Sequence, residues 1–460
     1  MEEQIKLSFT TIEKTLWNLT LETFQRSLVE ILSLLDKYLM AKRNKSRYEY
    51  KERKEKTLMT MLGEVTIKRR YYLDTEQNEW VFLLDELLGL EGTAVSDSLK
   101  ELVVIWATKG PSYRDVRDRL NDLFNNQILS HEKIRQLLIE SSEQLELKEA
   151  PEEKKKKVEM LFIEADGFWT GVQKRGNKSK KKRETKLIVV HEGWEKRQAG
   201  DYKLKNPMYF TSYRSEKAAD LWDRVFLRLW SKYEDIGSIP VIINGDFASW
   251  IRGGTDCFKH GFYQYDRFHL KRDIRKLLSR NRDNCKEALW AIDENVPEKL
   301  LQLLAEEQTL TKDEDIFEFI KRLKPHQETV IDYRMRLAEK EYQIPENLRG
   351  MGAAESNVDR FKLRTSKRGR AWSTKGLEAI LNMLGMLYEG TLKEAIAGLD
   401  SSIFTTEQAE ELVAMSAGQV AKQVGVETLH AQRAGFPSLG KGVSQGYSKL
   451  FRQMLEVQMA

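Results

Sequence analysis

The sequence predicts an α/β core that contains a helical insertion and follows a mainly helical region with one β-hairpin. Three observations indicate this organisation. Up to residue 150, apolar residues recur mostly at helical spacing; after a lysine-rich linker at 151–157, short apolar runs alternate with helical patterns; and residues 283–345 are helical in pattern and highly charged throughout. A chain of 460 residues has room for roughly three domains.

The first 90 residues predict a helical segment followed by a basic hairpin. Apolar positions at helical spacing within residues 1–45 indicate one long amphipathic helix or a pair of helices. The hairpin region spans residues 46–90, in which residues 57–74 alternate in polarity on either side of Gly63. The hairpin strands would carry three basic residues, Lys68, Arg69 and Arg70.

Residues 91–150 predict a helical, DNA-binding region. Two helices are expected at 112–124 and 130–145, joined by a short polar connection, with Ser112 and Ser130 placed as N-caps. A helix-turn-helix and a plain helical hairpin are both compatible with this pattern. In either arrangement the apolar residues of the second helix would lie in a core.

The remainder of the chain predicts the α/β core and its insertion. Residues 158–282 form the first part of the core, 283–345 the insertion, and 346–460 the last part with C-terminal helices. Within the first part, the patterns predict strands at 159–166, 186–191 and 240–245 and an amphipathic helix at 215–234.

Positive charge is clustered along the chain, although the net charge is only +5. Residues 42–56 hold eight basic and three acidic residues, 174–186 eight and one, and 360–370 six and none. Any one of these blocks alone is compatible with a solvated surface. Their recurrence favours a polyanionic partner, because phosphate contacts need clustered Lys and Arg. We therefore expect the chain to bind double-stranded DNA.

Cysteine content and hydropathy argue against a secreted or membrane protein. Two cysteines, Cys257 and Cys285, provide no disulfide framework. No apolar run reaches the ~18 residues of a membrane helix, and the first residues resemble no secretory leader. We expect a cytoplasmic protein without a membrane partner.

Three carboxylates follow features that suit a metal site. Asp166 ends the apolar run LFIEAD, and Asp246 ends PVIINGD, so two strand ends would carry acids that converge at one edge of a sheet. Glu355 opens a helix in AAESNVDRFKLR, which continues into basic residues. Each acid alone is compatible with a helix N-terminus. Together they would repel one another without a cation, and oxygen ligands suit Mg²⁺ or Mn²⁺.

These motifs resemble the DDE transposases of bacterial insertion sequences. The chain order Asp, Asp, Glu, in the motifs ADG, NGD and AAESNVDRFK with a helical insertion between the last two, is most similar to the ISLre-type family, long catalogued as uncharacterised, and more distantly to Mutator-like transposases. The hairpin segment GEVTIKRRYY and the segment LLDELLGL add to the resemblance, which covers nearly the whole chain.

The resemblance implies a ribonuclease-H-like catalytic domain that cleaves and transfers DNA strands at the ends of an insertion sequence. It places the catalytic and metal-ligand roles on Asp166, Asp246 and Glu355, with two Mg²⁺ (or Mn²⁺) ions. It adds Asp266 and His269 as accessory residues, His269 being structural or in contact with DNA. It further implies a homo-oligomer on DNA and an association with the bacterial nucleoid. The basic residues expected to contact DNA are Lys68, Arg69, Arg70, Lys180, Lys181, Lys182, Arg183, Arg360, Lys362 and Arg364.

Several assignments stay open at this stage. Glu164 and Asp256 are rival carboxylates, and strand alternation places Glu164 on the same face as Asp166. A zinc site of Cys257, His260, Asp266 and His269 is conceivable from its ligand types. Trp372 would pack or stack on a base. The chain would alternatively be a DNA-binding regulator or an inactive transposase relic, or a nuclease of the same fold that cuts without joining.

Overall fold

The computed structural model describes residues 8–124, 126–147, 154–174, 177–198, 200–213, 216–345 and 348–399; the side chains of residues 174, 177–180 and 368 are not described. The described chain forms two compact units that interleave in sequence. The first unit contains residues up to Leu102 and Asp118–Leu129, and the second contains Val103–Arg117 and Ser130–Leu399. The predicted six-segment division stays a prediction.

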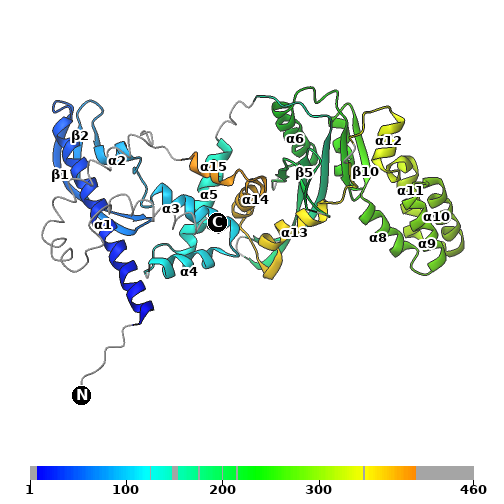
Figure 1. The fold of residues 1–460 in the computed structure, drawn as a ribbon, viewed down its shortest axis with the longest axis horizontal. Helices are drawn as coiled ribbons and strands as arrows, with labels where there is room; N and C mark the ends of the chain where they lie inside the picture. Colours follow the sequence, from blue (N-terminus) through cyan, green and yellow to red (C-terminus); the bar gives the residue numbers. More distant parts are fainter. Residues whose placement is uncertain are drawn as a thin grey trace, which may run out of the picture. The chain divides into compact units, whose positions relative to one another are not determined.

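The elements before residue 150 are α1 (Phe9–Lys42), β1 (Tyr48–Thr60), β2 (Gly63–Asp74), β3 (Glu79–Val81), α2 (Leu83–Leu88), α3 (Asp97–Lys109), α4 (Tyr113–Phe124) and α5 (His131–Leu147). The first unit is built around the predicted hairpin, which turns between Thr60 and Gly63 and is longer than expected. In Figure 1, α1 runs along the β1–β2 hairpin. Their common core is formed by Leu32, Leu35, Leu58, Val65, Ile67 and Leu84.

The second unit contains a mixed sheet and many helices. Its strands are β4 (Leu161–Lys174), β5 (Asn177–His191), β6 (Trp194–Gln198), β7 (Asp201–Leu204), β8 (Met208–Thr211), β9 (Val241–Gly245) and β10 (Gly261–Tyr265). Its later α-helices are α6 (Ala218–Lys232), α7 (Ser249–Arg252), α8 (Arg267–Leu277), α9 (Arg282–Asp293), α10 (Pro297–Thr311), α11 (Glu314–Leu323), α12 (Tyr333–Glu339), α13 (Ala354–Thr365), α14 (Thr374–Glu389) and α15 (Leu392–Ala397). Short 3₁₀ turns lie at η1 (Gly253–Cys257), η2 (Lys324–Val330) and η3 (Lys367–Gly369).

The prediction of a mixed α/β protein is confirmed. The main sheet has the order β10-β9-β4-β5-β8, in which β4, β9 and β10 are parallel and β5 is antiparallel to β4 and β8. One face packs its apolar residues, including Leu161, Ile163 and Val241, against α6 and α8. On the other face Phe162 packs near Tyr333 of α12. Figure 1 shows α6 against the sheet and α9–α11 grouped as a helical bundle within the insertion.

The predicted helix pair is present, with both caps as expected. The hydroxyl of Ser112 accepts from the Asp115 N–H at 3.1 Å, and that of Ser130 from the Lys133 N–H at 3.1 Å. α5 packs against α14, and an ion pair joins Glu143 to Lys375 at 2.8 Å. The buried face of α5 is therefore occupied by a helix of its own unit.

Two expectations about the core need correction. The strand predicted at 159–166 continues as β4 to Lys174, because β5 pairs with it along almost its whole length. The basic block 174–186, which alone is compatible with a solvated surface, accordingly lies largely in β5. The C-terminal helices predicted beyond residue 399 lie outside the described residues, whereas α14 and α15 precede that point.

Candidate metal centre

The two aspartates are brought together by the register of neighbouring parallel strands. β4 pairs with β9 from Leu161 with Val241 to Glu164 with Asn244, without a shift in register. Asp166 and Asp246 each lie two positions beyond the last of these pairs, at the same level of the sheet. The two aspartates are therefore as far apart in the sequence as each residue of β4 is from its partner in β9. Beyond Glu164, β4 has lost its partner on the β9 side, which leaves an open edge for Asp166.

Asp166 is a buried carboxylate among other acids. Its side chain is 8% exposed, and its Oδ1 accepts from the Gly167 N–H at 2.7 Å. Burial raises the pKa of Asp166 to about 6; the nearby Asp246 and Glu355 add to the rise, while the Gly167 hydrogen bond and His269 oppose it. A buried carboxyl that shares its surroundings with other acids is a common feature of functional sites.

Asp246 lies in a tightly held turn directly after β9. Its Oδ1 accepts from the Ala248 N–H at 3.1 Å. Phe247 has φ +70°, a left-handed conformation that bulky residues rarely adopt. The hydroxyl of Tyr263 accepts from the Phe247 N–H at 2.7 Å and donates to the Gly245 carbonyl at 2.9 Å. This network fixes the backbone on both sides of Asp246.

Glu355 is positioned by the carboxylate that competed with Asp166 as a candidate. Glu164 is fully buried and accepts from the N–H groups of Gly352 and Ala354 at 3.1 and 2.9 Å, next to His191 at 3.7 Å. Although burial opposes it, the contact with His191 and these N–H groups keep the pKa of Glu164 below its usual value. Glu164 therefore anchors the start of α13, whose first turn carries Glu355.

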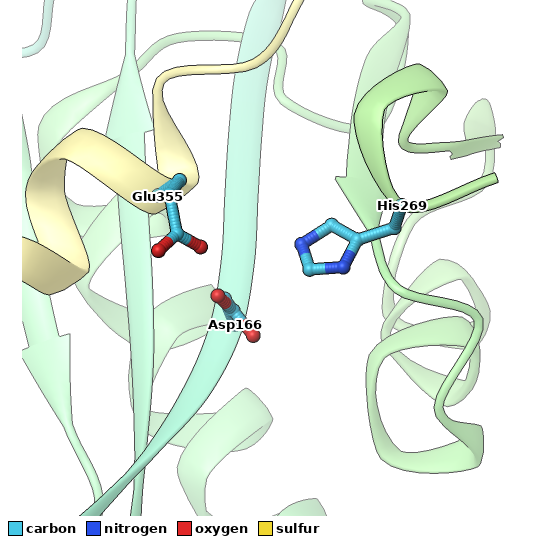
Figure 2. A group of neighbouring side chains, drawn as sticks. All are labelled: Asp166, His269 and Glu355. Carbon is cyan, nitrogen blue, oxygen red and sulfur yellow. The ribbon is translucent and has the colours of Figure 1, made fainter. Parts of the chain in front are cut away.

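Three side chains converge closely at this edge. One potential ligand atom from each of Asp166, His269 and Glu355 lies within 4.8 Å of the other two, the one such group of three or more within the described ranges. Figure 2 shows the imidazole of His269 facing the two carboxylates from across the strand. Asp246 is outside this group but close enough to raise the pKa of Asp166. The oxygen-rich set suits a divalent cation.

The two accessory residues have different structural positions. Asp266 is the N-cap of α8: its Oδ1 accepts from the His269 N–H at 3.0 Å, and its Oδ2 from the Asn244 amide at 2.7 Å. His269 points into the carboxylate group, which the sequence reasoning did not anticipate. Its orientation follows from its position in the first turn of α8, because this helix starts beside the residue that precedes Asp246. Cys257 and His260 do not join the group, and His260 Nδ1 contacts the Tyr342 hydroxyl at 2.7 Å.

Three of the arginines expected to contact DNA are buried. Arg69 pairs with Asp85 at 2.5 Å, and Arg70 pairs with Asp36. Arg364 donates to the Ala107 carbonyl at 3.1 Å, and burial lowers its pKa to about 10. None of the three presents a free guanidinium to a phosphate, which corrects our expectation of their positions. The burial of Arg69 could have been predicted from the sequence, because strand alternation places it on the same face as the buried Val65 and Ile67.

Other expected DNA-contacting residues keep an accessible charge. Lys181, Lys182 and Arg360 are exposed, and Lys68 is exposed beside Glu55 at 3.2 Å. Lys362 is partly exposed and lies 3.9 Å from Glu355. Arg183 is largely buried against Glu378 at 3.3 Å, and the side chain of Lys180 lies outside the described part. Trp372 packs in the interior and donates to the Thr365 carbonyl at 2.7 Å.

The fold and the site define a mixed α/β protein with a candidate divalent-metal centre at the edge of its sheet. The chain belongs to the uncharacterised protein family UPF0236, whose model matches residues 3–398. A UPF0236 protein of Caldanaerobacter subterraneus subsp. tengcongensis is 25% identical over 379 residues, covering 82% of this chain and 77% of its own. A UPF0236 protein of Streptococcus gallolyticus, from the vanSb 3′ region, is 26% identical, with 81% of each chain covered.

Among solved structures, the Drosophila P element transposase strand transfer complex matches with a TM-score of 0.24 and 10% identity, covering 69% of this chain and 84% of that one. Within the described residues, no helix is both long and apolar enough to cross a membrane.

Proposed function

We propose that this protein is a DDE-type transposase, which cleaves DNA at the ends of an insertion sequence and joins those ends to target DNA. The observation that carries the proposal is the arrangement of Asp166, Asp246 and Glu355: two acids at one level of neighbouring parallel strands, and a third on a helix anchored beside them. Membership of UPF0236 is compatible with the resemblance to ISLre-type transposases.

The sheet supports a ribonuclease-H-like core. Taken in chain order, three antiparallel strands (β4, β5 and β8) are followed by two strands (β9 and β10) that lie parallel to the first on its other side. The helical insertion follows β10 and precedes α13, which is where the resemblance expects it. Such an arrangement brings an acid from the first strand, one after the fourth strand and one from a later helix to one edge.

The residues at this edge fit a divalent cation. The buried carboxylate of Asp166 lies among other acids, and the imidazole of His269 faces it and Glu355. Asp166, Asp246 and Glu355 would hold the metal, proposed to be two Mg²⁺ or Mn²⁺ ions. Bound there, the metal would activate water and then a DNA 3′-hydroxyl for in-line attack on a phosphodiester. Exposed Lys181, Lys182 and Arg360 would hold the DNA backbone.

The test is a gel assay of labelled element ends with Mg²⁺ or Mn²⁺. Asp246→Asn removes an anionic ligand while keeping the shape of the side chain, so we expect end binding to persist and cleavage to fall by at least about 100-fold. Asp256→Asn is the matched control, because Asp256 is an exposed carboxylate of η1 outside the cluster, and this variant should cut like the wild type. Equal cleavage by Asp246→Asn and the wild type would refute the proposed role.

The two alternative functions give different results in the same assay. If the protein binds the ends but does not cut them in the presence of any divalent metal, it is a regulator or a relic. To separate joining from cutting, pre-cut ends with a free 3′-hydroxyl are incubated with a supercoiled plasmid. A transposase produces a joined product that runs as an open circle carrying the label, whereas a nuclease leaves the plasmid unlabelled.

A further inference from the structure

His269 is held in place by the end of the strand that leads to Asp246. The Asp266 N–H donates to the Gly245 carbonyl at 2.9 Å, and the Asp266 carboxylate accepts from Asn244 and from the backbone of His269. Two of these hydrogen bonds tie the start of α8 to β9, and the third caps the first turn of α8 itself. Because this turn is fixed, the direction of the His269 side chain is fixed relative to the acids.

The imidazole of His269 is buried without a hydrogen bond that would account for its position. The residue is 6% exposed, and its Nδ1 has no partner among the described residues. Buried polar atoms are nearly always partnered, so this Nδ1 calls for a partner on its own side of the ring. The other ring nitrogen, Nε2, is the one that faces Asp166 and Glu355 in Figure 2.

A simple ion pair does not explain this arrangement. Within the described part of the chain, the ring nitrogens of His269 form no ion pair with a carboxylate, whereas His191 lies 3.7 Å from Glu164. The spread of 4.8 Å instead approaches that of ligands around one ion. Ligand atoms about 2.1 Å from a common ion lie at most about 4.2 Å apart, so shifts of roughly half an ångström suffice.

We propose that His269 is a metal ligand, so that one cation binds a nitrogen from α8 together with oxygens from Asp166 and Glu355. This inference rests on the proposed function only in treating these acids as a divalent-metal site. Mg²⁺ strongly prefers oxygen ligands, whereas imidazole suits later first-row transition metals and Mn²⁺ accepts both donor types. His269 therefore shifts the preference of the site from Mg²⁺ towards Mn²⁺ and its neighbours in the first row.

The experiment is electron spin echo spectroscopy of Mn²⁺ bound to the full-length protein. A directly bound imidazole couples the ¹⁴N nucleus to the Mn²⁺ electron spin and modulates the echo. We expect this modulation in the wild type and its loss in His269→Gln. His260→Gln is the matched control, since His260 is partnered by Tyr342 outside the group and belonged to the rival zinc site; it should keep the modulation.

Labelling the wild type with ¹⁵N-histidine provides a second measurement that needs no substitution. The ¹⁴N pattern should be replaced by a ¹⁵N pattern, even if His269→Gln fails to fold. In a folded His269→Gln protein, Mn²⁺ affinity should fall at least about tenfold, and Mg²⁺ affinity, measured by competition, less than about threefold. An equal loss for both metals would overturn the proposed selectivity.

The remaining outcomes separate this inference from the proposed function. If Mn²⁺ binds, and binding is lost in Asp166→Asn, but no nitrogen coupling is seen, His269 is not a ligand and the carboxylate site remains. If millimolar Mn²⁺ does not bind the wild type at all, both the His269 inference and the metal-dependent function are overturned.

Discussion

At the residue scale, neighbouring acids of the site differ in what their oxygens contact. Glu164 and Asp166 share a face of β4 at alternate positions. The oxygens of Glu164 are used by backbone N–H groups that hold the start of α13, whereas Asp166 accepts one short hydrogen bond and faces other acids. The first carboxylate is stabilised as an anion by fixed donors, and the second is left for a cation. Alternation along the strand could not separate these roles, because the donors come from a segment that follows much later in the chain.

The raised pKa of Asp166 predicts a pH dependence of stability in the metal-free protein. Its pKa in the folded state is about 6, compared with 3.8 for the unperturbed group. Since the folded-state pKa is raised, this group contributes its full stability below about pH 4, and the contribution is lost as pH rises through about 6. With metal chelated, we expect the free energy of unfolding to fall by about 1–3 kcal/mol relative to Asp166→Asn between pH 4 and 7.

Urea denaturation at several pH values measures this difference. Added Mn²⁺ or Mg²⁺ should recover the lost stability of the wild type near pH 7, because the metal binds the ionised carboxylate. The exposed control Asp256→Asn should follow the wild type at every pH. If the free energy of unfolding changes with pH in the same way for the wild type and Asp166→Asn, the ionised form of Asp166 is not destabilised in the folded protein.

At the scale of elements, β4 explains why an apolar strand carries an acid. The apolar run LFIEADG predicts a strand that ends at Asp166, whereas in the structure only the pairing of β4 with β9 ends early, at Glu164. On the other side β5 continues to pair as far as Lys174. The end of the apolar run was the signal for an acid at a sheet edge. It could not predict the length of β4, because that length depends on a partner whose basic sequence resembles a solvated loop.

The exposed lysines of β5 predict a salt-dependent contribution to DNA binding. If Lys181 and Lys182 each neutralise one phosphate, the slope of log K against log salt should be reduced by about 0.9 for each of them that is replaced by alanine. A matched control replaces Lys299 and Lys321, which are lysines of the insertion paired with Glu287 and Glu318. Filter binding or fluorescence anisotropy over a range of salt measures the slope. A slope that is the same in both double variants would place the DNA elsewhere.

At the scale of the whole molecule, the order of regions was predictable but their assembly was not. Periodicity separated the hairpin, the α/β core and the helical insertion, because each has a local pattern. The interleaving of the units has no local signal. α3 spans the boundary at Leu102, and α5 belongs with the core because it packs on α14, where Glu143 meets Lys375 from a distant part of the sequence.

This interleaving predicts where the chain can be shortened. A cut after residue 145 appears natural from the sequence, but it removes nearly all of α5 and the segment that carries Ala107, whose carbonyl receives the guanidinium of Arg364. It would remove the helix that packs against one side of α14. The loss should approach the whole stability of a domain, about 5 kcal/mol or more.

We therefore expect a fragment of residues 97–460, which begins at the first residue of α3, to melt cooperatively and to bind Mn²⁺ as the intact chain does. A fragment of residues 146–460 should lack a cooperative transition and be digested rapidly by a low concentration of protease, because its core helix α14 has lost the helix that covers it. Circular dichroism melts and limited proteolysis of both fragments make the comparison, with Mn²⁺ binding as the test of an intact site. The opposite result would be that the 146–460 fragment melts at the same temperature as the 97–460 fragment and binds Mn²⁺ equally well. In that case α5 does not stabilise the core, and the domain boundary lies near the lysine-rich linker.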